Sequence, residues 1–264
     1  SVTTWLQKDE VMSQPWKIYD ALLDGLPEDV VVRTSGQGPR WSRVLNSAGG
    51  VGTAWTMDVR SRPALSDDGP LDGRPLRDVG ALVKSWNLAE ASIGQAAINS
   101  WYSREETAAA NGFEPTGEGL TWRQVFDPYQ EMIVGKRVAV IGHFPFAEAA
   151  LAGAGEYICL ERNLQPGDWP DSACEYVLPE CDLVFISSSS FVNKTAPRLI
   201  ELSRQAHTVL VGPSTPLNPV LLDYGVDTIT GFVAARSLSD PISLAEMVPA
   251  GDIGPGFRVH RHRA

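Results

Sequence analysis

Two turns rich in hydroxyl groups follow predicted strands in the second half of the chain, and their residue types suit the binding of an anion. Residues 187–190 are four consecutive serines, and residues 212–215 read Gly-Pro-Ser-Thr. Backbone N–H groups at a helix start, together with hydroxyls, form a cradle for a carboxylate, sulfate or phosphate. Serines that merely cap two helices are the alternative, and the pattern leaves the two interpretations about even. The candidate ligand-binding residues of this region are Ser187, Ser188, Ser189, Asn193, Lys194, Gly212, Ser214 and Thr215.

His143 and Glu161 each follow a strand of a predicted strand–helix–strand unit. The β-branched strand at 137–141 and the second strand at 156–160 should be parallel, because a helix connects them. Ligands of such sheets bind beyond the carboxyl ends of the strands, so both side chains should lie at the mouth of a crevice. In an enzyme, His143 or a carboxylate such as Glu90 or Glu161 would move a proton while the serine turns stabilise a departing anion.

Metal binding would need several ligands that converge on one point. The cysteines contain no CxxC pair, and a buried cysteine behaves by default as a small hydrophobic residue, so a core role is favoured for Cys159, Cys174 and Cys181. No cofactor is certain from these residue types, and a divalent metal is compatible with them. No residue is assigned as a metal ligand. A hard cation would instead use the acidic side chains of Glu161, Asp168, Asp171 and Glu175.

Two familiar kinds of site lack the spacing that they need. The turn from Gly142 to Phe146 reads GHFPF rather than GxGxxG, and its bulk lies where a pyrophosphate needs bare backbone, which argues against a dinucleotide. No GxSxG segment exists, and His143 is the one evident base for the serines, which argues against a Ser–His–Asp triad.

The elements that must position these residues differ between the two halves of the chain. In the first half, strands separated by short Gly turns predict an antiparallel meander, at residues 30–34, 41–45 and 51–59, with helices at 15–26 and 76–84. The second half alternates strands with helices, which predicts a parallel, Rossmann-like sheet with further strands at 182–186, 208–211 and 228–233. A linker within 104–124 would separate an α+β domain, 1–124, from a Rossmann-like domain, 125–264, and the tail 260–263 should be a solvated end.

A helix at residues 87–102 is apolar on almost all sides, which predicts that it is buried. We expect its start to face the strand ends of the second half, because small-molecule sites tend to form between domains. Trp86 and Asn87 are therefore candidate ligand-binding residues. Glu90 has three interpretations: it stabilises the helix start, it pairs with a basic residue such as Lys194 or Arg198, or it projects into the crevice as a ligand or general base.

Composition limits the classes of partner. The chain has 264 residues, a hydrophobic content of 43% and a formal net charge of −10, which fits a globular protein and disfavours nucleic acid or an anionic membrane. No run of 18 apolar residues exists and the first 20 residues lack a continuous apolar core, so neither a membrane span nor a signal peptide is predicted. Three cysteines, an odd number, favour a reducing cytoplasm over a disulfide framework.

Long strings of the chain resemble a known family. GKRVAVIGHFPF, NKTAPRLIELSR and LVGPSTPLNP are similar to a Rossmann-like domain of unknown function that is described as a heavy-metal-chelation domain. SWNLAEASIGQAAINSWY and VGTAWTM resemble its enolase N-terminal-like companion domain. The resemblance implies an α/β fold, in which a C-terminal Rossmann-like parallel sheet flanked by helices follows a smaller α+β domain. It also implies metal chelation, without a defined set of catalytic residues.

The sequence therefore predicts a protein that binds a small polar or anionic ligand, such as a metal or a metal–chelate complex, in a crevice between two domains. The alternative is a cofactor-independent lyase or cyclase of specialised metabolism that expels sulfate or phosphate. A small-molecule ligand is the expected partner, and a homo-oligomer or a small partner protein is compatible with the sequence.

Overall fold

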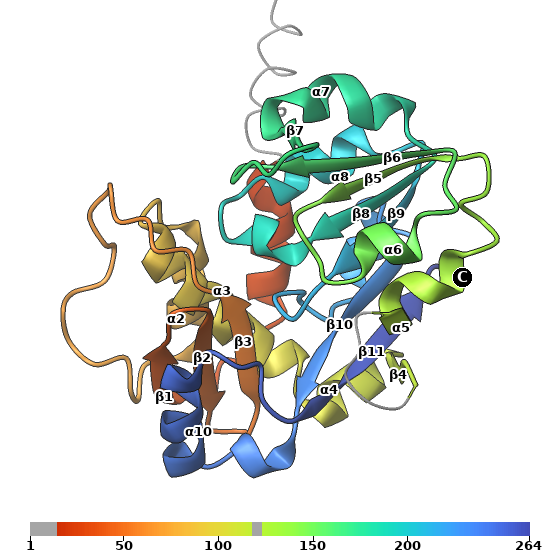
Figure 1. The fold of residues 1–264 in the computed structure, drawn as a ribbon. Helices are drawn as coiled ribbons and strands as arrows, with labels where there is room; N and C mark the ends of the chain where they lie inside the picture. Colours follow the sequence, from red (N-terminus) through yellow and green to blue (C-terminus); the bar gives the residue numbers. More distant parts are fainter. Residues whose placement is uncertain (1–14, 118–122) are drawn as a thin grey trace, which may run out of the picture.

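The computed structural model describes residues 15–117 and 123–264, which form two β-sheets with helices packed around them (Figure 1). The predicted absence of a signal peptide concerns mainly residues 1–14, which lie outside the described residues. Within the described residues, no helix is both long and apolar enough to cross a membrane.

The smaller sheet is the predicted antiparallel meander, with β1 (Val32–Gln37), β2 (Trp41–Asn46) and β3 (Val51–Trp55) in that order. The predicted apolar helix is α3 (Leu88–Tyr102), which packs on β2 and β3 and is buried along most of its length. The approach is backbone to backbone, because a Cβ on Gly94 would lie 2.1 Å from Val83 N. Val83 belongs to the 3₁₀ helix η1 (Ala81–Lys84), which continues α2 (Leu76–Gly80).

The larger sheet has eight strands in the order β4–β11–β10–β9–β8–β5–β6–β7. Its parallel part confirms the predicted Rossmann-like sheet, and the strands follow the β-branched and apolar runs of the sequence. From β5 the chain moves outward to β6 and β7 and then returns to the other side of β5 to form β8, so the order reverses between β5 and β8. These strands are β5 (Arg137–Ile141), β6 (Glu156–Glu161), β7 (Trp169–Pro170), β8 (Leu183–Ser187), β9 (His207–Val211) and β10 (Thr228–Ala234).

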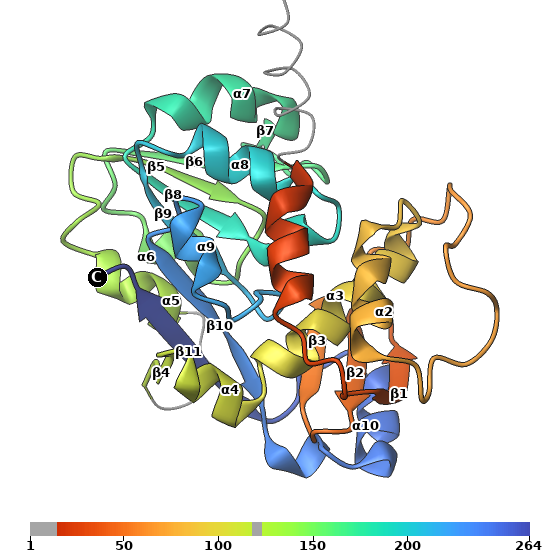
Figure 2. The same ribbon diagram turned by 180° about the vertical axis from the view of Figure 1, so that it is seen from behind.

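Helices cover both faces of the larger sheet (Figures 1 and 2). On one face, α5 (Arg123–Phe126), the 3₁₀ helix η2 (Asp127–Tyr129) and α6 (Ala147–Ala150) pack on inward side chains of β5, β8 and β9. The opposite face packs against the helix at residues 15–24 and against α7 (Cys174–Val177), α8 (Ala196–Leu202) and α9 (Val220–Asp223). Short 3₁₀ helices flank α7 and follow β8, namely η3 (Asp171–Ala173), η4 (Leu178–Glu180) and η5 (Ser188–Phe191).

The tail was predicted wrongly, because it is a strand rather than a solvated end. β11 (Gly256–His262) pairs antiparallel with β10 and carries the edge strand β4 (Glu114–Pro115) on its other side. Val259, which is 2% exposed, packs in the core although the sequence of the strand is basic, and the neighbouring Arg258 is also buried. The predicted linker also contains structure, since α4 (Glu105–Ala110) and β4 lie within it.

The chain returns to the smaller sheet after β10. The 3₁₀ helix η6 (Arg236–Leu238), α10 (Pro241–Met247) and η7 (Val248–Ala250) follow β10, and Leu238 and Leu244 pack on Leu45 and Val51 of the meander. The first half of the sequence thus adds β4 to the larger sheet, and helices of the second half cover part of the smaller sheet. The division into 1–124 and 125–264 remains a prediction.

Candidate functional site

Three side chains with different donor atoms meet where β5 and β6 end and β7 begins. His143 follows β5 after Gly142, whose φ of 100° turns the chain away from the sheet. A side chain at Gly142 would also put its Cβ 3.1 Å from the Cβ of Ser187, so the sharp turn needs glycine. Cys159 lies within β6, opposite Val140 of β5, and Asp168 directly precedes β7.

The donor atoms of His143, Cys159 and Asp168 all lie within 4.8 Å of one another. Asp168 Oδ2 is 2.6 Å from His143 Nε2 and also accepts a hydrogen bond from the backbone N–H of Gln165. The other ring nitrogen, Nδ1, lies 3.9 Å from Cys159 Sγ. The side chain of Asp168 is 6% exposed whereas that of His143 is 38% exposed, so the cluster opens to solvent on the histidine side.

The surroundings of this cluster are acidic. Burial, and after it the negative charges of Asp168, Glu161 and Glu148, raise the pKa of the Cys159 thiol to about 12. The hydrogen bond from Gln165 N–H and, after it, the contact with His143 outweigh burial and lower the pKa of Asp168. A cation at this position would therefore be stabilised by fixed negative charge, and an anion would be repelled.

The two hydroxyl-rich turns contact each other through their hydroxyls, and the buried Ser190 Oγ has no hydrogen-bond partner among the described residues. Thr215 Oγ1 donates to Ser188 Oγ at 2.7 Å, and Ser187 Oγ lies 2.8 Å from Ser189 Oγ. Ser188, Ser214 and Thr215 are buried. These contacts fasten the turn after β8 to the turn after β9, in which Gly212 has a φ of 109°. Their binding of a ligand remains a prediction.

Ser214 also joins the second half of the chain to α3. Its Oγ accepts a hydrogen bond from Trp55 N, and its carbonyl accepts from Gln95 Nε2 at 3.1 Å and Asn99 Nδ2 at 2.8 Å. Gln95 and Asn99 are fully buried polar side chains on the apolar helix. The polar residues of that helix thus serve as hydrogen-bond donors to the turn after β9.

The start of α3 faces the loop after β8, as the sequence predicted. Lys194 adopts the left-handed conformation at φ 66°, and its Nζ donates to Ser85 O at 2.6 Å and lies 4.7 Å from the centre of the Trp86 ring. Burial lowers the pKa of Lys194 to about 8. Asn193 Oδ1 accepts from Thr195 within its own turn, and Asn87 caps α3 by accepting from Glu90 N. Trp86 and Lys194 are therefore in contact. The binding of a ligand by either residue remains a prediction.

Glu90 and Glu161 have contacts of a different kind from those that the sequence suggested. Glu90 accepts hydrogen bonds from Leu65 N and from both Ser66 N and Ser66 Oγ, so it holds the loop after β3. Neither of the two expected ion pairs forms, because Lys194 contacts carbonyl groups and Arg198 pairs with Glu175 and Glu201. Glu161 Oε1 accepts from the neighbouring Arg162 N, and its charge acts on Cys159. A catalytic role for either glutamate remains a prediction.

Sequence reasoning placed His143 at this edge of the sheet but did not group Cys159 and Asp168 with it. Cys159 was favoured as a core residue, and its side chain is indeed 8% exposed. Asp168 was grouped with other acidic residues as a candidate for a hard cation. Two of these residues form ion pairs instead, because Asp171 pairs with Arg162 and Glu175 pairs with Arg198. The parallel pairing of β5 with β6 was the available signal, because it brings the end of β5 beside the second half of β6.

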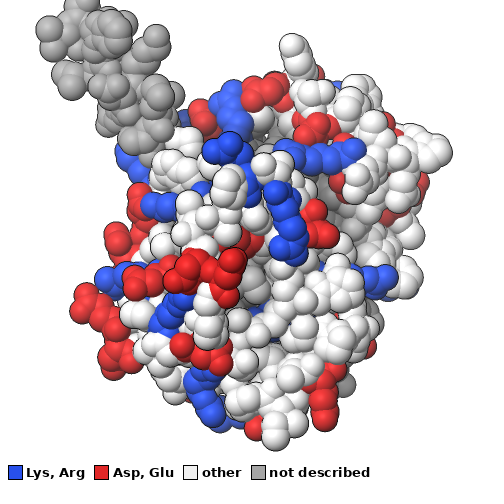
Figure 3. Space-filling model, turned by 90° about the vertical axis from the view of Figure 1, so that its left-hand side faces the viewer, with Lys and Arg blue, Asp and Glu red and all other residues white. Residues whose placement is uncertain are grey.

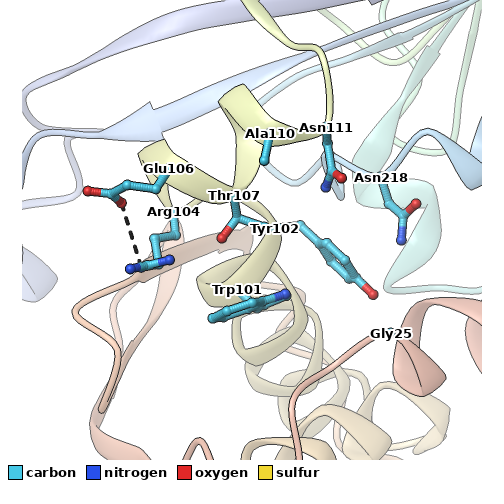
Figure 4. Close-up of a pocket in the computed structure, with 9 residues that line it drawn as sticks. All are labelled: Gly25, Trp101, Tyr102, Arg104, Glu106, Thr107, Ala110, Asn111 and Asn218. Atoms are coloured by element: carbon cyan, nitrogen blue, oxygen red, sulfur yellow. Dashed lines mark ion pairs between the residues drawn. The ribbon is translucent and has the colours of Figure 1, made fainter.

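Two pockets lie away from all the site residues predicted from the sequence. One of about 490 Å³ lies between the end of α3, α4 and the segment after β9, and is lined by Trp101, Tyr102, Arg104 and Asn218 among others (Figure 4). The other, of about 250 Å³, is lined by Ser103, Arg104, Glu105 and Arg236 among others. Their charged residues are already paired with each other, because Arg104 and Arg236 both contact Glu106.

Acidic and basic side chains are interspersed on the face of the molecule in Figure 3. That face therefore has no broad field of one sign, such as a nucleic-acid surface would need. The oligomeric state and the cytoplasmic location remain predictions.

The two-sheet architecture places the chain among Rossmann-like α/β proteins with an added antiparallel meander. Two family models, DUF4213 and DUF364, match residues 19–102 and 124–257, and both are described as "Putative heavy-metal chelation". The chain therefore belongs to this family, as the resemblance of its sequence indicated.

Solved structures agree with this assignment. A protein of unknown function from the DUF364 family of Desulfitobacterium hafniense is 36% identical, with a TM-score of 0.81 over 94% of this chain and 98% of that one. A second, from Pyrococcus horikoshii, is 21% identical, with a TM-score of 0.74 over 95% of this chain and 100% of that one, and supports the fold alone. No curated protein matches the chain.

Proposed function

We propose that the protein binds a divalent transition-metal ion, or a small complex of one, through His143, Cys159 and Asp168. The observation that carries this proposal is the convergence of a nitrogen, a sulfur and an oxygen donor within 4.8 Å. Donors bound to one zinc-like ion at about 2.0–2.3 Å cannot lie farther apart than about 4.6 Å, so small side-chain adjustments suffice. The family description supports the same class of ligand.

The donor set favours a borderline or soft metal. Imidazole and thiolate suit ions such as Zn²⁺, Ni²⁺ and Cu²⁺, whereas Mg²⁺ and Ca²⁺ prefer oxygen donors only. The hydrogen bond between Asp168 and His143 Nε2 leaves Nδ1 on the side of the thiol, 3.9 Å from Cys159 Sγ. In the protein without metal, this hydrogen bond fixes the orientation of the His143 ring.

Three protein donors leave coordination positions open, and a small ligand from solution would fill them. The half-exposed side of His143 provides access to those positions. A polar or anionic molecule that chelates the metal would bind there through the metal ion, whose charge offsets that of Asp168 and Glu161. This unites the two expectations from the sequence, a small anionic ligand and a metal–chelate complex.

The predicted alternative, a cofactor-independent lyase, has no supporting geometry. Ser188 Oγ and Ser214 Oγ accept hydrogen bonds from Thr215 Oγ1 and Trp55 N, and Thr215 Oγ1 also contacts Gly212 O, so these turns are bound to other parts of the protein. Glu90 is likewise engaged with the backbone of Leu65 and Ser66.

Titration of the metal-free protein with Co²⁺ tests the proposal, because a cobalt–thiolate bond gives a charge-transfer band in the near ultraviolet. We expect this band with one equivalent of Co²⁺ in the wild type, and its loss in Cys159→Ser. The matched control is Cys181→Ser, since Cys181 is also buried but bonds to Val177 O in another part of the sheet. Zn²⁺ should compete with Co²⁺ for the site.

The other two ligands are tested in the same titration. His143→Ala should weaken metal binding at least as much as Cys159→Ser, and so should Asp168→Asn, because it removes the negative charge of the carboxylate ligand. A band that persists in Cys159→Ser, or that disappears equally in Cys181→Ser, would refute the assignment.

A further inference from the structure

Three of the four histidines lie at the end of the larger sheet remote from the His–Cys–Asp cluster. His260 and His262 belong to β11, and His207 begins β9. Figure 2 shows β11 between β10 and β4, whereas His143 follows β5 on the other side of β8 and β9. Residues two apart in a strand point to the same face, and the His260 and His262 rings lie with their centres 5.0 Å apart.

Both rings are held by threonine hydroxyls through the same nitrogen. Thr116 Oγ1 lies 2.9 Å from His260 Nδ1, and Thr228 Oγ1 lies 3.0 Å from His262 Nδ1. When each Nδ1–H donates to its threonine, the lone pair is on Nε2. Among the described residues, neither Nε2 atom has a hydrogen-bond partner. Metal-binding histidines are typically held in this way, with one ring nitrogen bonded to the protein and the other left for the metal.

A carboxylate lies on the same face of the sheet. Glu114 of β4 is the direct cross-strand partner of His260, and its charge raises the pKa of the His260 ring. Directly opposed residues of an antiparallel pair share a face. β4 is the edge strand and Glu114 is exposed; its carboxylate does not form a cluster within 4.8 Å with both rings, so it must reorient to share an ion with them.

Burial and the neighbouring His262 lower the pKa of His260, against the smaller opposing effect of Glu114. Thr228 Oγ1 also lies 3.4 Å from His207 Nε2, so its hydroxyl can donate to His207 while it accepts from His262.

We propose that His260 and His262 form a second metal site, which takes a borderline divalent ion such as Ni²⁺, Cu²⁺ or Zn²⁺ with Glu114 as the third ligand. This site contains no sulfur, so it differs chemically from the cluster at His143. Two imidazoles and one carboxylate are a donor set that such ions accept, and the remaining positions are left to water.

Calorimetric titration of the full, untagged chain with Ni²⁺ tests this proposal. The background variant is His143→Ala, because it removes the first cluster and makes the result independent of the function proposed for that cluster. We expect one Ni²⁺ to bind to His143→Ala. Adding His262→Ala should weaken Ni²⁺ binding at least about 100-fold, more than the loss of an orienting residue alone, and adding Glu114→Gln should weaken it less.

His207→Ala in the same background is the control, since this ring shares Thr228 but directs its Nε2 at the hydroxyl. It should leave Ni²⁺ affinity within about threefold of the background variant, which is small beside the effect of losing a ligand. His262 is exposed, so its removal should not unfold the protein, and a thermal melt checks this. Absence of Ni²⁺ binding in His143→Ala, or unchanged affinity after the loss of His262, would overturn the proposal.

Discussion

Glu90→Gln should destabilise the protein at neutral pH by about 1–2 kcal/mol. The carboxylate accepts three hydrogen bonds, from Leu65 N at 2.7 Å, Ser66 N at 3.0 Å and Ser66 Oγ at 2.6 Å. A hydrogen bond to a charged group contributes about 1.5–3 kcal/mol, but the half-exposed position of Glu90 reduces this through solvent screening. Glutamine retains one acceptor oxygen and turns its NH₂ group toward the remaining donors. Loss of the charge in the first turn of α3 adds about 0.3–1 kcal/mol.

The effect of Glu90→Gln should also depend on pH. Burial alone would raise the pKa of Glu90, but the hydrogen bonds from Ser66, Ser85 and the backbone outweigh burial and lower it. A group whose pKa is lower in the folded state stabilises the protein above its unfolded pKa, about 4.3 for glutamate, and loses that contribution as the pH falls through the folded pKa. The difference between wild type and variant should therefore shrink on acidification.

Urea unfolding curves measured at pH 7 and at the lowest pH that still gives a cooperative transition provide the assay. Glu28→Gln is the control, because the side chain of Glu28 is 86% exposed and its pair with Arg77 should contribute less than about 1 kcal/mol. Co²⁺ binding should be unchanged in Glu90→Gln. Equal stability at pH 7, a difference that grows toward acid, or loss of metal binding in the folded variant would refute the structural role of Glu90.

Two further substitutions test the packing of α3. Gly94→Ala should cost about 3 kcal/mol or more, because its Cβ would lie 2.1 Å from the backbone N of Val83, whereas Gly153→Ala, with its nearest contact at 3.9 Å, should be nearly neutral in the same urea assay. Asn99→Ala should cost about 2–3 kcal/mol, because it removes donors to Thr53 O and Ser214 O at a fully buried position. Asn111→Ala, which loses one 3.4 Å bond to Leu217 O, should cost less than half as much, and the reverse ranking would contradict this account.

Much of the fold could be predicted because hydrophobic periodicity is a local signal. The meander, the buried helix α3 and the alternating strands of the second half all follow from runs of residues that determine one element each. β11 could not be predicted in the same way. Its basic sequence carries only weak alternation, and it becomes a strand because β10 and β4 supply hydrogen-bond partners from distant parts of the chain.

The candidate site was predicted in part for the same reason. His143 follows a clear strand and a glycine turn, so its place at the carboxyl edge could be inferred from local sequence. Cys159 and Asp168 become its neighbours through the pairing of β5 with β6 and through the loop that leads to β7. A buried cysteine has no local feature that distinguishes a ligand from a core residue. Only the register of the sheet brings its sulfur to the histidine.

The arrangement of the strand ends favours a site at β5, β6 and β7 over a crevice between the two halves. In doubly wound sheets ligands usually bind where the strand order reverses, which here is between β5 and β8. At the β8 and β9 ends of this sheet, the loops are bound to the first half of the chain, since Tyr19 donates to Phe191 O and Trp55 N donates to Ser214 Oγ.

The ends of β5 and β6 lack such a cover at His143, whose side chain is 38% exposed. The donor cluster, which opens to solvent at His143, therefore lies one strand farther from the reversal, on the side of β7. On this view the first half of the chain fixes the turns after β8 and β9. The sheet is therefore held rigid beside the end of β5, which His143 follows. The proposed metal ligands all come from the strand–helix–strand unit and the loop that follows it.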